Sequence, residues 1–219
     1  MARDYHDYFI KDGRHIGRYD EMYQNCADPW RIEEMGPRPD MRAALLLLAG
    51  REGQVGRFLD IGAGLGLFTG LLTQALWREN PAARGVVTDI APAAVEQAAR
   101  RLADARLEFR PLDARRLAEG DPFPPASFDL IVMAQVLWGL LEDLPGTLSA
   151  LANLLPPGGL MLISQHFLPP GGQGYGADVV AGPEDFSAHL DQAGLIVSQT
   201  LETNRLTNHH WAALAEKRA

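Results

Sequence analysis

Cysteine is almost absent from this sequence, and so are long hydrophobic runs. Cys26 is the single cysteine, so the chain can form neither an internal disulfide nor a cysteine-rich zinc site. The longest purely apolar run, residues 43–49, is far shorter than the roughly 20 residues that span a bilayer. The first residues also lack the apolar segment of a signal peptide. These absences predict a soluble, cytoplasmic protein with no membrane partner.

Positive charge is also in short supply. The formal net charge is −8 and the isoelectric point about 5.2, so the surface repels a phosphate backbone. The basic pairs Arg100–Arg101 and Arg115–Arg116 have no aromatic residues between them and are typical of solvated helix faces. We therefore expect a small-molecule substrate and no nucleic-acid partner. The sequence leaves a homodimer open.

The 219 residues are 47% hydrophobic and 22% charged, values typical of one globular domain. From residue 56 onward, apolar strands alternate with helices, which predicts an α/β fold with a parallel sheet covered on both faces. No helix separates the last two strands, so we expect them to pair antiparallel. The predicted strands are 56–61, 85–89, 107–110, 128–133, 160–164, 195–201 and 210–216, and the predicted helices are 67–78, 92–105, 147–155 and 183–192.

The first 55 residues do not share this alternation and are rich in aromatic side chains. Asp40 is placed to cap a further helix over residues 41–49. The segment fits two interpretations: helices anchored on the sheet edge by their aromatic residues, or a lid that closes over a ligand. We expect one domain, 1–219, with residues 1–55 as a helical cap or lid and residues 56–219 as a cofactor-binding core. The aromatic residues of the segment are Tyr5, Tyr8, Phe9, Tyr19, Tyr23 and Trp30.

A glycine-rich turn links the first predicted strand to its helix. The strand ends at Asp60, and glycines follow at positions 62, 64 and 66. Such a turn lets a ligand approach the backbone closely. A dinucleotide site would place its third glycine at position 67, where this chain has Leu67, and no Gly-Lys-Ser/Thr phosphate loop is present.

The pattern Asp60-x-Gly62-x-Gly64-x-Gly66 resembles motif I of the class I S-adenosylmethionine-dependent methyltransferases. Residues 128–132, the turn at 154–159 and the closing strand pair are also similar to this family. The resemblance implies a three-layer Rossmann-like fold with a mostly parallel seven-stranded sheet and an antiparallel C-terminal strand. It further implies that S-adenosylmethionine is the cofactor, with S-adenosylhomocysteine as its product. The implied cofactor-binding residues are Asp60, Gly62, Ala63, Gly64, Gly66, Asp89, Ile90, Asp113, Ala114 and Gln135.

The three acidic residues of this set match positions that have specific roles in that family. Asp60 would interact with the ammonium group of the ligand, and Asp89, at the end of the second core strand, would bind the ribose hydroxyls. Asp113, after the third core strand, would meet the adenine amino group. An alternative for Asp113 is that it caps a short helix.

Methyl transfer needs an aligned acceptor, a site that excludes water and, for many acceptors, a base. The ends of the core strands bring three histidines toward one rim of the sheet: His166, His209 and His210. His166 is the first candidate base, and His209 and His210 should point to opposite faces. The rim carries Gln135 and Gln165 where the metal-dependent catechol type carries carboxylates, so we expect no metal. The candidate substrate-binding residues are Trp138, Tyr175, Arg205, Tyr19 and Trp30.

Residues 133–136 lack the signatures of the adenine, glutamine and cytosine methylating enzymes. The segment Asp28-Pro29-Trp30 and the compact size are similar to small-molecule methyltransferases of the nodulation protein S type. We therefore expect methyl transfer to N or O of a small polar acceptor, such as a sugar-like molecule or a secondary metabolite. Two alternatives remain open: a protein or RNA methyltransferase, and a non-catalytic subunit that binds S-adenosylmethionine for a partner. A nicotinamide dehydrogenase is disfavoured by Leu67.

Overall fold

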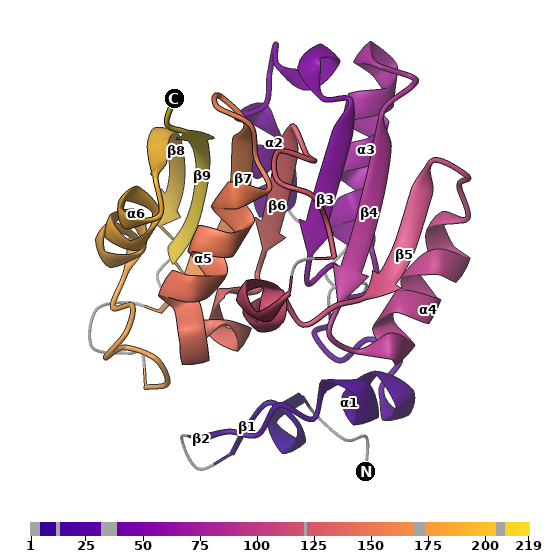
Figure 1. The fold of residues 1–219 in the computed structure, drawn as a ribbon. Coiled ribbons are helices and arrows are strands. Elements are labelled where there is room, and N and C mark those ends of the chain that lie inside the picture. Colours follow the sequence, from indigo (N-terminus) through magenta and orange to yellow (C-terminus); the bar gives the residue numbers. More distant parts are fainter. Residues whose placement is uncertain (1–4, 12–13, 32–38, 121, 169–173, 205–208) are drawn as a thin grey trace.

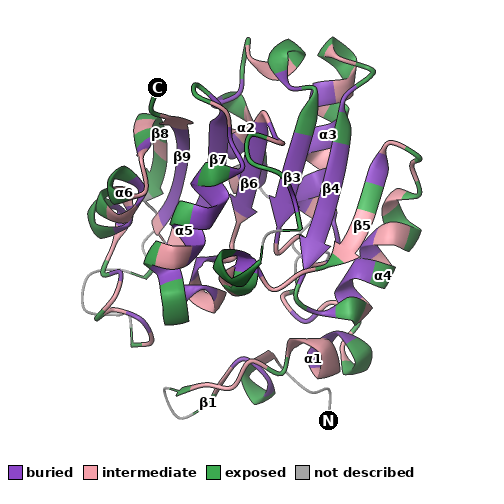
Figure 2. Ribbon diagram, viewed as in Figure 1, coloured by how far each residue is buried: buried purple, intermediate pink, exposed green. Residues whose placement is uncertain are grey.

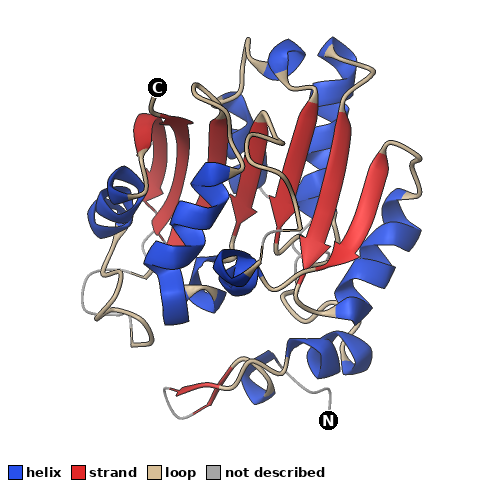
Figure 3. Cartoon of the chain, viewed as in Figure 1, coloured by secondary structure: helices blue, strands red, loops and turns tan. Residues whose placement is uncertain are grey.

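The computed structural model describes residues 5–11, 14–31, 39–120, 122–168, 174–204 and 209–219. A central sheet of seven strands carries helices on both faces (Figures 1 and 3). The strand order is β5-β4-β3-β6-β7-β9-β8, and only β9 runs antiparallel to its neighbours. The predicted fold class is therefore confirmed. The strands are β3 (Arg57–Ile61), β4 (Arg84–Asp89), β5 (Leu107–Pro111), β6 (Leu130–Ala134), β7 (Leu160–Phe167), β8 (Leu195–Asn204) and β9 (His209–Lys217).

The central strands are buried on both faces, as Figure 2 shows for β3, β4 and β6. One core lies between the sheet and helices α5 (Leu144–Asn153) and α6 (Pro183–Gln192). The second core lies on the opposite face, against α2 (Pro39–Leu46) and α3 (Leu67–Glu79). Burial on both faces explains why these strands read as continuous apolar runs in the sequence.

Two helices begin or end at other residues than predicted, because helix capping and backbone conformation set their boundaries. Helix α4 (Pro92–Leu102) ends three residues before the predicted residue 105, because Ala103 adopts a left-handed conformation with φ of 38°. Helix α5 begins at Leu144 instead of residue 147, because Asp143 caps it by accepting a hydrogen bond from the Gly146 N–H. The remaining short helices are η1 (Tyr5–Asp7), η2 (Glu52–Gln54), η3 (Ala114–Glu119), η4 (Leu137–Gly139) and η5 (Leu141–Asp143).

The described part of the N-terminal segment before α2, residues 5–11 and 14–31, lies beneath the carboxyl ends of the core strands, whereas α2 packs on one face of the sheet (Figure 1). The segment is not wholly helical as expected, because β1 (Ile10–Lys11) and β2 (Arg14–His15) form a small antiparallel hairpin before α1 (Tyr19–Asn25). Two-residue strands are too short to give a sequence pattern. Helix α1 docks on α4, where Asp20 Oδ1 accepts a hydrogen bond from the Ala93 N–H at 2.8 Å.

Within the described residues, no helix is both long and apolar enough to cross a membrane.

Candidate functional site

A cavity of about 390 Å³ opens at the carboxyl ends of β3, β4 and β6. Its floor is the turn from Asp60 to Phe68 together with Asp89, and its roof is the group of N-terminal aromatic residues Tyr5, Phe9, Tyr19, Tyr23 and Trp30. Ligands of open α/β sheets bind at this edge, where strand order reverses. Here the reversal falls between β3 and β6.

Nine of the ten predicted cofactor-binding residues line this cavity. They are Asp60, Gly62, Ala63, Gly64, Asp89, Ile90, Asp113, Ala114 and Gln135. The tenth, Gly66, does not line it and packs against α4 instead. A Cβ there would lie 2.9 Å from Leu102 Cδ1 and 3.2 Å from Ala98 Cβ. Gly66 therefore allows close helix packing.

The glycines of the floor hold a backbone that other residues rarely adopt. Gly62 and Gly64 have φ values of 67° and 55°. A Cβ on Gly62 would lie 2.4 Å from Val136 Cγ2, and one on Gly64 would lie 2.8 Å from the Tyr23 hydroxyl. The missing side chains therefore let Val136 and Tyr23 pack directly against the turn.

Asp60 is a buried carboxyl at the centre of the floor. Its Oδ2 accepts a hydrogen bond of 2.6 Å from the Thr69 hydroxyl. Its Oδ1 is buried and has no hydrogen-bond partner within the described part of the chain. Burial raises the pKa of Asp60 to about 7, with a smaller opposing effect of the Thr69 hydrogen bond. A cationic group placed in the cavity would satisfy this oxygen.

Asp89 is fixed by backbone groups at the end of β4. Its Oδ2 accepts a hydrogen bond from the Gly64 N–H and its Oδ1 one from the Ala91 N–H, both at 2.9 Å. Burial raises the pKa of Asp89, and the backbone donors only partly oppose that effect. The carboxylate therefore also braces the glycine turn against the second core strand.

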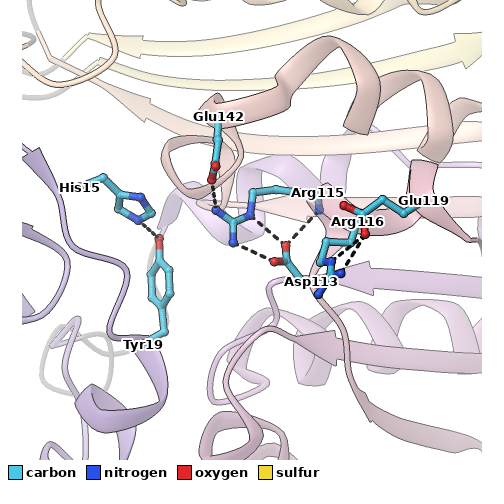
Figure 4. A network of polar contacts seen from close by, with 7 residues as sticks. All are labelled: His15, Tyr19, Asp113, Arg115, Arg116, Glu119 and Glu142. Atoms are coloured by element: carbon cyan, nitrogen blue, oxygen red, sulfur yellow. Dashed lines mark hydrogen bonds and ion pairs between the residues drawn. The ribbon is translucent and has the colours of Figure 1, made fainter.

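Asp113 forms a charged network with Arg115 (Figure 4). Two guanidinium nitrogens of Arg115 donate to the two Asp113 oxygens at 2.9 and 2.7 Å, and a third donates to Glu142 at 2.6 Å. Asp113 also caps η3 by accepting from the Arg115 backbone N–H, so the capping alternative is observed at a residue that lines the cavity. The Arg115 hydrogen bonds lower the pKa of Asp113.

The basic pair 115–116 is thus divided between two environments. Arg116 pairs with Glu119 on the solvated surface, as the sequence predicts. Arg115 instead lines the cavity, and the expectation of a solvated face was wrong for this residue.

Gln135 bridges the ends of β6 and β7. It has a φ of 59°, its N–H donates to the Ser164 carbonyl at 2.8 Å, and its Oε1 accepts from the His166 N–H at 3.1 Å. These contacts orient the amide so that Nε2 is the remaining donor. This nitrogen is buried with no partner among the described residues. Gln135 therefore offers a fixed donor at the cavity.

None of the three predicted catalytic histidines lines the cavity. His166 pairs with Asp40 of α2, Nε2 to Oδ2 at 2.8 Å, and His210 pairs with the Ser164 hydroxyl at 3.0 Å. Alternation along β9 turns His209 to the opposite face, where it contacts Glu202 at 2.8 Å. All three histidines lie at the rim where β7 ends, as expected, with His166 and His210 on one face of the sheet, their rings 4.9 Å apart, and His209 on the other. A catalytic role for any of them stays a prediction.

Three of the five predicted substrate-binding residues line the cavity: Tyr19, Trp30 and Trp138. Tyr175 lies behind this layer, with its ring 6.5 Å from the Phe9 ring. Arg205 lies outside the described residues. Among the described residues, no group of three or more His, Cys, Asp or Glu side chains is placed to hold a metal ion.

Sequence reasoning missed a hydrogen-bonded pair beside the roof. His15 Nε2 lies 2.9 Å from the Tyr19 hydroxyl (Figure 4). No sequence pattern assigned His15 a role, and only the density of aromatic residues in this segment pointed to it. The roof also contains Phe9, Tyr5 and Tyr23, which the sequence indicated only as aromatic residues of this segment.

Fold and site agree with the predicted class, the class I S-adenosylmethionine-dependent methyltransferases. Residues 59–161 match a family model described as a methyltransferase domain. The chain is similar to highly reducing polyketide synthase 2 of Gibberella zeae, with 33% identity over 57% of this chain and 5% of that protein. It is also similar to nodulation protein S of Rhizobium tropici, with 28% identity over 60% of this chain and 52% of the relative. The chain thus spans a twentieth of the first relative and about half of the second.

Among solved structures, the trans-methyltransferase CalH in complex with S-adenosylhomocysteine is 25% identical. The TM-score is 0.65, over 81% of this chain and 57% of that chain. The predicted family and its cofactor are therefore confirmed.

Proposed function

We propose that the protein transfers a methyl group from S-adenosylmethionine to N or O of a small polar acceptor. The cavity carries this proposal: its floor has the glycine turn and two buried carboxyls of a cofactor site, and its roof closes off the space where an acceptor would lie. Residues 56–219 would form the cofactor-binding core, and residues 1–55 the cap. The match to nodulation protein S and to a polyketide synthase supports a small-molecule acceptor over a macromolecular one.

The chemistry of the floor fits S-adenosylmethionine. The unsatisfied Asp60 Oδ1 would accept a hydrogen bond from the ligand's ammonium group, and Asp89 would bind the ribose hydroxyls. Asp113, with the Ala114 N–H beside it, would hold the adenine, and Gln135 Nε2 would donate to an oxygen of the ligand. When bound, the cofactor supplies a methyl group already activated on a sulfonium.

The residues of this chain then have three tasks. They orient the acceptor, exclude water and receive a proton. Trp138, Tyr19 and Trp30 would form the walls that orient the acceptor, since these aromatic residues line the cavity. The roof would exclude water, because Tyr23, which covers Gly64, is almost fully buried.

Calorimetric titration with S-adenosylhomocysteine and with NAD tests this function. We expect binding of the former only, and we expect Asp60→Asn to weaken it about 30- to 100-fold, because a charge-assisted hydrogen bond is lost. The matched control, Asp129→Asn, changes a carboxylate that contacts the Gly56 and Arg57 N–H groups outside the cavity. Binding of NAD alone, or equal affinity in the Asp60 variant and the wild type, would overturn the proposal.

A further inference from the structure

Tyr19 is the one described side chain of the cavity lining whose hydroxyl contacts an imidazole. It stands at the start of α1 and reaches across the cavity to η4. A Cβ on Gly139 would lie 2.9 Å from the Tyr19 oxygen. The hydroxyl therefore lies at the carboxyl end of β6, next to Trp138, where an acceptor would be held. On its other side is His15 Nε2, at 2.9 Å (Figure 4).

The other acidic groups of the lining are engaged elsewhere. Asp113 is neutralised by Arg115, and Asp89 accepts two backbone N–H groups. The Tyr23 hydroxyl accepts a hydrogen bond from Trp30 Nε1 at 2.9 Å and is buried. Asp60, with one oxygen on Thr69, has the other available for the ammonium group of the cofactor. Two phenols of the lining are left. The Tyr5 ring stacks on His6, with centroids 3.9 Å apart, and the Tyr19 hydroxyl contacts His15, which makes Tyr19 and His15 a hydrogen-bonded pair through which a proton can leave the cavity.

The surroundings of the pair set its protonation state. His15 packs between the rings of Phe9 and Tyr175, with centroids 5.4 and 5.7 Å away. Burial, together with Arg115, lowers the pKa of His15, and Glu142 opposes this only weakly. Burial, and then the nearby Tyr175, raises the pKa of Tyr19 well above its usual value, and Arg115 opposes this in part. At neutral pH the phenol therefore donates and the neutral imidazole accepts.

We propose that Tyr19 is a catalytic residue that takes the proton of a hydroxyl acceptor and passes its own proton to His15. This inference rests on the proposed methyl transfer and selects O–H over N–H acceptors. The acceptor proton moves to the Tyr19 oxygen as the Tyr19 proton moves to His15 Nε2. The electron pair freed on the acceptor oxygen forms the bond to the methyl carbon, and the sulfur keeps the electrons of the bond that breaks. The imidazolium then returns its proton to solvent.

The chemistry of the pair favours a hydroxyl. A hydroxyl becomes strongly acidic only as its oxygen is methylated, so a weak base that acts during the step is sufficient. An amine that arrives protonated must be deprotonated before it can attack, which demands a stronger base than an imidazole of lowered pKa.

The test uses the full chain and pairs of probes that differ only in the acceptor atom. S-adenosylhomocysteine release is measured with benzyl alcohol and benzylamine, and with 2-phenylethanol and 2-phenylethylamine, because these amines are protonated at neutral pH. We expect turnover with hydroxyl probes and a drop of at least 100-fold in kcat for Tyr19→Phe and His15→Gln. S-adenosylhomocysteine affinity should stay within threefold. His189→Gln is the control, since that histidine lies on α6 and contacts the Val179 carbonyl outside the cavity.

A pH profile separates proton transfer from a packing role. Wild-type kcat should fall on the acid side, below pH 6.5, as His15 becomes charged, and His15→Gln should lose this limb. Turnover of amine probes only, or hydroxyl turnover in Tyr19→Phe within threefold of wild type, would overturn the inference and leave the transfer intact. A wild-type protein that binds the cofactor product but turns over no probe would overturn both.

Discussion

The floor and the roof of the cavity are built in different ways. The floor is held by the two cores: its carboxyls are buried, and backbone N–H groups of the glycine turn and of α4 fix Asp89. The roof is attached to the core mainly by aromatic packing and by α1, which touches α4 through Asp20 and through the Tyr23 carbonyl. Under the proposed function, recognition of the methyl donor would belong to the folded core, whereas contact with the acceptor would depend on the N-terminal segment.

The largest effect that we expect comes from Asp60 in the floor. Its pKa is raised from 3.8 to about 7, so between these values the folded state holds a proton that the unfolded state has lost. Stability should therefore fall as pH rises from about 4 to 7, by on the order of 2–4 kcal/mol. Asp60→Asn should remove most of this slope, because the raised pKa of Asp89 then acts against the lowered pKa of His15, which makes stability rise with pH. Urea unfolding at pH 4.5 and pH 8 measures the free energy of unfolding of the wild type and the variant. An equal change with pH in the two proteins would contradict the raised pKa of Asp60.

The second prediction concerns the glycine turn. Gly62→Ala should lower the free energy of unfolding by about 3 kcal/mol, because the methyl group meets Val136 and an L-residue is strained at φ of 67°. Gly50→Ala isolates the strain, since Gly50 has φ of 80° and nothing within 4 Å of an added Cβ. It should cost about 1 kcal/mol. Adding Val136→Ala to Gly62→Ala should recover part of the difference. Equal losses in the two single variants would show that the clash is relieved without cost.

The contrast between floor and roof also explains what the sequence could predict. Continuous apolar runs, Asp60 and three alternating glycines predict strands and a turn directly, because each residue type there meets a backbone or burial requirement. Leu67 excluded a dinucleotide site through one missing glycine. These features depend on local sequence, so a single chain reveals them.

The roof could not be predicted in the same way. The hydrogen bond between His15 and Tyr19 spans a turn between β2 and α1, and the position of His166 against Asp40 joins residues 126 apart in sequence. Such contacts depend on how the N-terminal segment packs against the core. No periodic pattern in the sequence indicates that packing. Strand alternation could place His209 and His210 on opposite faces. It could not say that α2 would cover the face of His166 and His210.

The smallest effect that we expect concerns the docking of α1. Asp20 caps the first turn of α4 by accepting from the Ala93 N–H, so Asp20→Ala should cost about 1 kcal/mol of stability. If α1 closes the cavity, the same change should speed dissociation of S-adenosylhomocysteine about five- to tenfold, because the roof opens more often. Stopped-flow displacement measures this rate. The control Glu96→Ala removes an exposed carboxylate from α4 that pairs only with Arg100 in the described structure. A rate unchanged by Asp20→Ala, with the loss of stability present, would make the roof a fixed wall, and the acceptor would then have to enter beside it.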